Sequence, residues 1–314
     1  MADSDSDSTP SHLEPSALGT KEYWDALYEK ELSNHAENPR DEGTVWFDDA
    51  DAEAKMVAYL LDHHAPSPSP SSVSAAASVL DLGCGNGSLL FALRDAGWRG
   101  RMLGVDYSER SVELARRVGA SRRRAARRRR RRCGDDGDDG DGDEDEDSEE
   151  EEEEEDKDDD DDNNDGTEWE EVEFKVWDVL KGPLADVAAA DTSADTADTA
   201  QGTGRDRDPG WDVVLDKGTF DAVSLSGERD GRGRRVCEGY GERVLRLLRT
   251  GGVFLVTSCN WTEKELRDWF ETKTPPTAAG ERLRMAGRIQ YPSFQFGGVQ
   301  GQTISTLCFE KTAA

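Results

Sequence analysis

The chain alternates between short apolar runs and segments in which apolar residues recur at helical spacing. Five short apolar runs predict buried strands, and several end in Gly or Asp, as parallel strands often do: 78–83, 101–106, 172–179, 211–216 and 253–259. Helical spacing of apolar residues separates or follows these runs at 87–98, 108–119, 241–252 and 262–271. This alternation predicts an α/β fold with a doubly wound, mostly parallel sheet.

Two more strands are predicted near the C-terminal end of the chain. Residues 289–298 and 303–311 have strand-like composition, and Gly297 and Gly298 stand between the two runs. This pattern predicts an antiparallel hairpin that closes the sheet at seven strands.

Three segments lack periodic apolar residues and cannot build a core. A Pro/Ser/Ala-rich linker covers 65–78, a basic block joined to an acidic block covers 121–167, and a small, polar stretch covers 185–209. We expect the last two to be disordered insertions in surface loops, where long additions cost little stability.

The remaining pattern gives the predicted domain organisation. Residues 79–312 form one Rossmann-like domain that contains the two insertions. Residues 1–16 are expected to be a disordered N-terminus because they are acidic and polar. Residues 17–64 are expected to form a helical segment that acts as a lid.

Charge limits the class of partner. The chain carries a formal net charge of −30, and residues 121–165 hold 24 Asp or Glu against nine Arg and one Lys. An acidic surface suits a basic protein and disfavours nucleic acid or an anionic membrane. The arginine block 122–132 matches a nuclear-import signal or a nucleic-acid patch. The acidic run beside it supplies a counter-charge, and we favour a solvated insertion without a dedicated function.

Neither a disulfide nor a metal site is expected. The five cysteines share no C-x-x-C spacing, and all four histidines precede the first core strand. The N-terminus has no apolar signal-peptide region, and no apolar run approaches the ~20 residues that span a bilayer. We therefore expect a soluble, cytoplasmic protein, with the nucleus as a second location if 122–132 acts as an import signal.

The sequence VLDLGCGNGSLL, residues 79–90, predicts a strand that enters a glycine turn and then a helix. The glycines follow neither the G-x-G-x-x-G spacing of dinucleotide sites nor the G-K-[ST] ending of a P-loop. Asp81 precedes the turn, so a cationic amine or sulfonium would be attracted there and an anion repelled. The pattern D-x-G-x-G-x-G resembles the first motif of class I S-adenosylmethionine-dependent methyltransferases.

Acidic residues at the ends of three further predicted strands support this resemblance. Asp106 is placed to accept the ribose hydroxyls, although it would also favour the helix that follows it. The resemblance assigns the adenine amino group to Asp178 and the adenine ring to the amide of Val179. Asp216 ends the fourth strand, beside the crevice that open α/β sheets form. The resulting cofactor-binding candidates are Tyr23, Trp24, Asp81, Gly83, Cys84, Gly85, Asn86, Gly87, Asp106, Tyr107, Asp178, Val179 and Asp216.

Longer matches narrow the resemblance to one family. LGTKEYWDALYEKEL, VWF, LDKGTFDAVSL, GGVFLVTSCNWTEKEL and YPSFQFGG resemble the eukaryotic lysine methyltransferases that act on translation elongation factor 1-alpha. The match covers nearly all of the chain outside the three segments without a core pattern. One departure is WFDD, in which Asp48 stands where the family would have Gly.

This resemblance implies a protein-lysine acceptor and a pocket to receive it. Methyl transfer from a sulfonium is an in-line displacement, for which positioning supplies most of the acceleration. Asp216 is the candidate carboxylate for the acceptor ammonium, with Phe220, Tyr23 and Trp24 as candidate aromatic walls. Asn260 and Trp261 follow the fifth strand and are expected at the same opening. Core packing is the alternative interpretation of the aromatic residues, and for Phe220 both interpretations stay open. Trp24 is expected to be a cofactor lid, because it lies outside the predicted core and beside charged residues. We assign no role to Lys217.

Other functions stay open at this point. The acceptor could be another protein lysine or a small molecule. The chain could also be a non-enzymatic interaction protein that uses its acidic tract. An inert domain would be expected to lose the glycine turn or the strand-end carboxylates, and this chain keeps both. We therefore expect a monomeric methyltransferase that acts on a basic protein, with elongation factor 1-alpha as the expected substrate.

Overall fold

The computed structural model describes residues 12–64, 77–134, 171–189, 210–292, 294–296, 299–301 and 303–314. Most of the predicted N-terminal disordered segment, the linker and the two predicted insertions lies outside these residues. Within them, no helix is both long enough and apolar enough to cross a bilayer.

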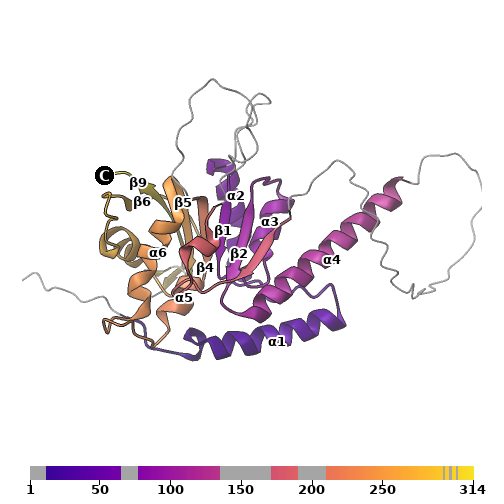
Figure 1. Cartoon of the computed structure of the whole chain (residues 1–314), viewed down its shortest axis with the longest axis horizontal. Coiled ribbons are helices and arrows are strands. Elements are labelled where there is room, and N and C mark those ends of the chain that lie inside the picture. The colour runs from indigo at the N-terminus through magenta and orange to yellow at the C-terminus, as the bar shows by residue number, and fades with distance from the viewer. Residues whose placement is uncertain are drawn as a thin grey trace, which may run out of the picture.

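A seven-stranded sheet forms the centre of the molecule, with the order β3-β2-β1-β4-β5-β9-β6 (Figure 1). Its five parallel strands are β1 (Val79–Leu82), β2 (Met102–Asp106), β3 (Glu173–Val176), β4 (Trp211–Lys217) and β5 (Leu248–Ser258). The predicted doubly wound, mostly parallel sheet is confirmed, and β1 lies between β2 and β4 as the strand at which the sheet order changes direction.

The antiparallel end of the sheet differs from the predicted hairpin. β9 (Ser305–Thr312) pairs with β5, and its other neighbour is β6 (Arg282–Ile289). The prediction missed β6, although its apolar residues alternate with exposed positions such as Arg282 and Arg284, as in a half-buried strand. The aromatic run around the Gly pair forms a separate two-stranded sheet of β7 (Phe294–Phe296) and β8 (Val299–Gly301).

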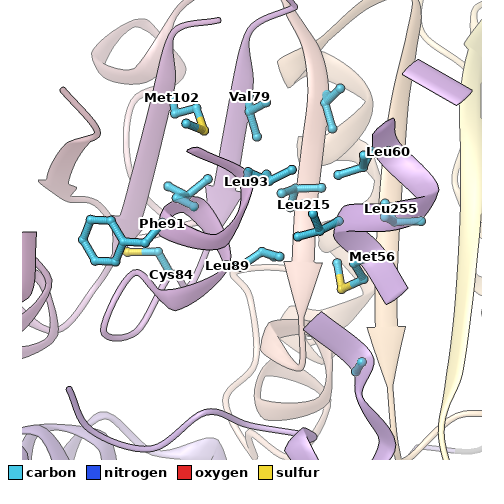
Figure 2. Close-up of a cluster of buried hydrophobic side chains, with 14 of the residues drawn as sticks. Met56, Leu60, Val79, Cys84, Leu89, Phe91, Leu93, Met102, Leu215 and Leu255 are labelled. Carbon is cyan, nitrogen blue, oxygen red and sulfur yellow. The ribbon is translucent and has the colours of Figure 1, made fainter. Parts of the chain in front are cut away.

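Helices cover both faces of the sheet because the strands alternate apolar side chains between two cores. Val213 and Leu215 of β4 face one core, and Val214 faces the other. The first core includes α2 (Ala52–His64), α3 (Ser88–Asp95) and the start of α4 (Glu109–Gly134), as Figure 2 shows in part. The second core includes α5 (Thr219–Ser224), α6 (Tyr240–Leu247) and α7 (Glu263–Arg267), followed by a π-helical turn at Asp268–Lys273.

The N-terminal segment has two parts with different roles. A 3-10 turn (Ala17–Gly19) and α1 (Lys21–Glu37) lie across the lower side of the molecule in Figure 1, where α1 packs against α4. A second 3-10 turn (Asp48–Ala50) leads into α2, whose Met56 and Leu60 are fully buried against the sheet. Helix α2 is therefore part of the core.

Two segments expected to be disordered are ordered at their ends. Helix α4 does not stop near Gly119 but continues to Gly134, because Arg and Ala favour helices and no Gly or Pro interrupts residues 120–133. Arg122 fixes the start of this extension through ion pairs with Glu42 and Asp95. The second predicted insertion begins with a 3-10 turn at Leu184–Val187, in which Val187 is buried.

Substitution of Leu60 tests whether α2 belongs to the core. Leu60→Ala should lower the free energy of unfolding by about 2–5 kcal/mol, because it leaves a cavity beside the sheet. Urea denaturation measures the difference. Asp62→Ala, on the exposed side of the same helix, should change it by no more than about 0.5 kcal/mol. Equal effects of the two substitutions would contradict the assignment.

Candidate active site

A cavity of about 310 Å³ lies where the C-terminal ends of β1, β2 and β4 meet the N-terminal segment. Gly83, Asp106 and Lys217 contribute to it from the strand ends, and Trp24 and Phe47 contribute from the N-terminal segment. Ligands of open α/β sheets bind at such a point, where the strand order changes direction. The site is therefore built from two parts of the chain that are far apart in the sequence.

The glycine turn has the close packing that its sequence predicts. Gly83, Gly85 and Gly87 all have positive φ, at 66°, 57° and 82°. A Cβ on Gly83 would lie 2.1 Å from Oγ1 of Thr219, whose hydroxyl donates a hydrogen bond to the carbonyl of Leu82. The turn after β1 is therefore packed directly against the turn after β4.

Of the predicted turn residues, Gly83 alone is part of the cavity wall as the structure describes it. Cys84, Gly85, Asn86 and Gly87 shape the turn from outside that wall. A Cβ on Gly85 would lie 2.8 Å from the hydroxyl of Tyr28, which itself lines the cavity.

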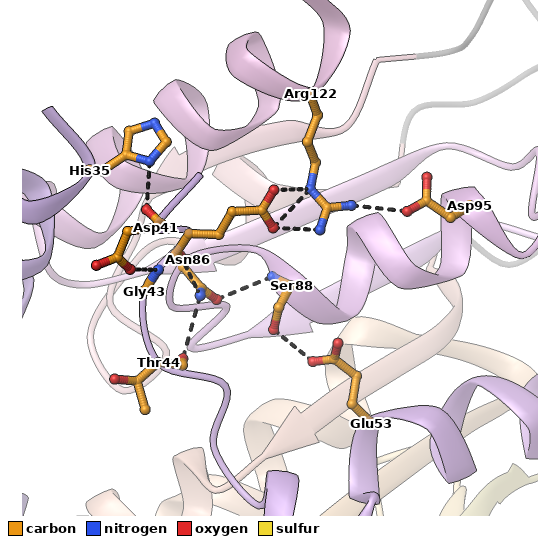
Figure 3. A network of polar contacts seen from close by, with 10 residues as sticks. His35, Asp41, Gly43, Thr44, Glu53, Asn86, Ser88, Asp95 and Arg122 are labelled. Atoms are coloured by element: carbon orange, nitrogen blue, oxygen red, sulfur yellow. Dashed lines mark hydrogen bonds and ion pairs between the residues drawn. The ribbon is translucent and has the colours of Figure 1, made fainter. Parts of the chain in front are cut away.

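Asn86 joins the glycine turn to the N-terminal segment (Figure 3). Its Nδ2 donates to the carbonyl of Glu42 at 2.8 Å, and its Oδ1 accepts from the amide of Ser88 at 3.2 Å. The hydroxyl of Ser88 donates to Glu53 of α2 at 2.6 Å. The role of Asn86 in this structure is to hold the chain around Glu42 against the turn.

Asp106 lies at the end of β2 and faces the cavity. Its carboxylate accepts hydrogen bonds from the amides of Gly85 and Ser108, at 3.3 and 2.9 Å. Burial raises the pKa of this carboxyl to about 6, although these hydrogen bonds act in the opposite direction. Tyr107, the next residue, also lines the cavity, and its hydroxyl donates to the carbonyl of Thr20.

The residues predicted for the adenine end also reach the cavity. Asp178 and Val179 follow β3 and line the cavity beside Trp177 and Leu180. One carboxylate oxygen of Asp178 accepts from the amide of Leu180 at 2.7 Å, which fixes the turn.

Asp81 is buried in β1 and does not form part of the described wall. Burial raises its pKa well above the usual range, and the positive charge of Lys217 opposes this shift. The negative charges of Asp216 and Glu53 raise the pKa of Asp81 further. Lys217 lines the cavity.

Asp216 does not reach the cavity, so its predicted role at the acceptor is wrong. It is fully buried and accepts a hydrogen bond from the Tyr240 hydroxyl at 2.6 Å and from the amide of Thr219 at 2.8 Å. Burial raises its pKa to about 7. The physical reason is the alternation of β4, which sends Asp216 to the α6 side of the sheet and Lys217 to the α2 side.

Phe220 and Trp261 belong to the second core and do not line the cavity, so their predicted places at the acceptor opening are wrong. The Phe220 ring is 1% exposed, and its centroid lies 4.9 Å from that of Phe270 and 6.2 Å from that of Trp261. Core packing explains both residues. Asn260 lies in the cavity wall, as predicted.

Asp221 is a carboxylate of the cavity wall that was not predicted from the sequence, and it lies in the wall with Asn260. It lines the wall and accepts hydrogen bonds from the Ser258 hydroxyl and from the amide of Cys259, the latter at 2.8 Å. Burial raises its pKa above the usual range. Its sequence signal is the second acidic residue of DKGTFDA, whereas the strand-end position favours the first, Asp216.

Aromatic residues of the N-terminal segment line the cavity, though not the pair that was predicted. Trp24 is in the wall and its Nε1 donates to the carbonyl of Leu18 at 2.8 Å, whereas Tyr23 is 36% exposed and packs edge-on against Trp24. Trp46 and Phe47 complete the wall and were missed. Their sequence signal was the VWF match, for which no position in the fold could be given.

The residues present fit S-adenosylmethionine. Strand-end carboxylates at Asp106 and Asp178 suit ribose and adenine, and the apolar neighbours Val105, Trp177 and Val179 suit a purine ring. In the part of the chain that the structure describes, no group of His, Cys, Asp or Glu is arranged to hold a metal ion.

Cofactor affinity should depend on pH through Asp106. Below its pKa of about 6 the carboxyl is protonated and loses acceptor capacity, so the affinity for S-adenosylmethionine should fall by up to about tenfold per pH unit. Calorimetry between pH 5 and 8 measures the dissociation constant. Asp106→Asn should bind more weakly at pH 8 and should remove most of this dependence. An unchanged profile in the variant would show that another group, such as Asp81, controls binding.

The chain is similar in sequence to known methyltransferases. Residues 74–129 match the family model described as a methyltransferase domain. The protein-lysine N-methyltransferase EFM4 of Saccharomyces cerevisiae is 35% identical over 300 residues, which cover 95% of this chain and 96% of the yeast protein. EEF1A lysine methyltransferase 2 of Homo sapiens is 27% identical over 95% of this chain and 88% of its own. Among solved structures, the N-methyltransferase NodS of Bradyrhizobium japonicum is 13% identical, with a TM-score of 0.42 over 92% of this chain and 98% of NodS.

The identity to EFM4 extends over nearly the full length of both proteins. The structure of the chain also has a cavity at the strand ends whose residues fit S-adenosylmethionine. The chain therefore belongs to the family of S-adenosylmethionine-dependent protein-lysine N-methyltransferases that includes EFM4 and EEF1A lysine methyltransferase 2.

Proposed function

We propose that this chain transfers the methyl group of S-adenosylmethionine to a lysine of translation elongation factor 1-alpha. The relatives named EEF1A lysine methyltransferase 2 align over 95% of the chain, which supports the same substrate. The net charge of −30 supports a basic protein partner, because opposite charges speed the encounter of two proteins.

The cofactor would be held across the ends of β1, β2 and β3. Asp106 would accept the ribose hydroxyls, and Asp178 with the amide of Val179 would bind the adenine. Gly83 would allow the backbone to approach the methionine part of the cofactor. Tyr107 and Trp24 would cover the cofactor from the open side, with Tyr23 supporting Trp24.

The acceptor lysine would enter at the other end of the cavity, between Asp221, Phe47 and Asn260. The buried carboxylate of Asp221 is the observation that carries this assignment, because it offers a counter-charge for an ammonium in an otherwise mostly apolar wall. The hydrogen bonds from Ser258 and Cys259 fix its orientation. The ring of Phe47 adds an aromatic surface that favours a cation.

S-adenosylmethionine, when bound, supplies an electrophilic methyl group. The chain then has to orient the acceptor nitrogen and to assist the loss of its proton, since an ordinary lysine has a pKa of about 10.4. Asp221 would hold the ammonium and favour its alignment, and the proton would pass to water. Phe47 and Trp46 would exclude other water from the reacting atoms.

Asp221→Asn is the variant that tests the acceptor site. It should lower kcat by about a hundredfold because the ammonium loses its counter-charge, while the dissociation constant of the cofactor should change by less than about threefold. The measurement uses methyl-labelled cofactor and purified elongation factor 1-alpha, with the modified residue mapped by mass spectrometry. Asp230→Asn is the matched control, since Asp230 also accepts hydrogen bonds from backbone amides in a loop but does not line the cavity.

Two outcomes would contradict the proposal in different ways. Cofactor binding without any label on elongation factor 1-alpha would overturn the substrate and leave the methyltransferase assignment intact. Label on elongation factor 1-alpha that Asp221→Asn does not reduce would overturn the acceptor site and leave the substrate intact.

A further inference from the structure

Lys217 is a largely buried cation in the cavity wall, to which the proposed reaction assigns no role. It is the last residue of β4, and its side chain is 11% exposed. Its Nζ donates to the carbonyl of Trp46 at 3.3 Å and lies 3.6 Å from a carboxylate oxygen of Glu53. Removing an ion from water is costly, so a buried ammonium with two such partners requires an explanation.

One partner belongs to the aromatic part of the wall. Trp46 precedes Phe47, whose φ of 65° is unusual for a bulky residue and is sustained only by its surroundings. The Phe47 ring lies over Gly218, the residue after Lys217, where a Cβ would lie 3.1 Å from the ring. Lys217 therefore holds the backbone at Trp46, and the next residue, Phe47, packs its ring on Gly218, the residue after Lys217.

The other partner leads to the glycine turn. Glu53 is in the first turn of α2 and its side chain is 17% exposed. The carboxylate oxygen of Glu53 that faces Lys217 also accepts a hydrogen bond from the hydroxyl of Ser88, the first residue of α3. One ammonium thus connects the end of β4, the Trp46–Phe47 segment and, through Glu53, the helix that follows the glycine turn.

We propose that Lys217 is a positioning residue for methyl transfer: its contacts with the Trp46 carbonyl and with Glu53 set the place of Phe47 relative to the cofactor and the acceptor. The inference rests on the proposed function, because Phe47 matters for catalysis only if the acceptor enters beside it. A misplacement of about 1 Å in such a wall can cost about a hundredfold in rate.

A second lysine provides a matched control. Lys311 in β9 is also buried, donates to the carbonyl of Leu248 at 2.9 Å and lies 3.2 Å from Glu281. It makes the same kinds of contact and does not line the cavity. A purely structural role for Lys217 predicts that Lys217→Met and Lys311→Met act alike, by lowering stability.

The first measurement is hydrogen exchange of the full-length protein, which needs no protein substrate. The amides of Ala50, Asp51 and Ala52 donate to carbonyls of Phe47 or Asp48, so they report on this turn. Lys217→Met should raise exchange over residues 44–52 by about tenfold, whereas Lys311→Met should leave it unchanged. Unchanged exchange in Lys217→Met would overturn the proposal.

The second measurement is turnover at saturating S-adenosylmethionine. Lys217→Met should lower kcat by about tenfold or more, Lys217→Arg should recover part of the loss, and Lys311→Met should keep the wild-type kcat. Equal losses in the two Met variants, or no recovery with Arg, would overturn the positioning role. Absence of wild-type turnover on elongation factor 1-alpha would instead overturn the proposed function, and hydrogen exchange would still decide whether Lys217 places the segment.

Discussion

The parallel pairing of β1 with both β2 and β4 is the constraint on which the site depends. Leu82 at the end of β1 is in register with Val105 and with Asp216, so the three strands end at the same edge. The chain leaves β1 toward one face of the sheet and leaves β4 toward the other. The two turns stay in contact through Thr219 and Leu82, and the space that opens between the departing helices is where a ligand can bind.

The pleat of the strands decides which face of the sheet each acidic side chain points to. Asp81 and Lys217 share one side of the sheet, and the carboxylate of Asp216 turns to the other, where the Tyr240 hydroxyl satisfies it. Asp221, five residues after Asp216 and in α5, does place its carboxylate in the cavity wall. Burial raises the pKa values of Asp81, Asp106 and Asp221, and the positive charge of Lys217 opposes this shift at Asp81.

The fold could be predicted because its signals are local. Apolar runs, glycine turns and helical spacing place β1 to β5 correctly, and Gly83, Asp106, Tyr107, Asp178 and Val179 follow from their positions after strands. The errors concern the face of an element or its distant partners. A strand-end position did not show that Asp216 points away from the cavity, and apolar character did not distinguish a cavity wall from a core at Phe220. The places of Trp46, Phe47 and Lys217 depend on contacts across about 170 positions of sequence, for which one sequence carries no signal.

The N-terminal segment covers the crevice at the strand ends and so completes the cavity. Trp24 and Phe47 come from this segment, and Asn86, Arg122 and Lys217 hold its chain against the domain. Hydrogen exchange of the wild-type protein with and without S-adenosylmethionine tests this claim most directly. If the segment completes the site, the cofactor will protect residues 17–28 and 44–52 as well as the ends of β1 and β2. Protection confined to the strand ends would show that the cofactor binds without the N-terminal segment and would contradict the account.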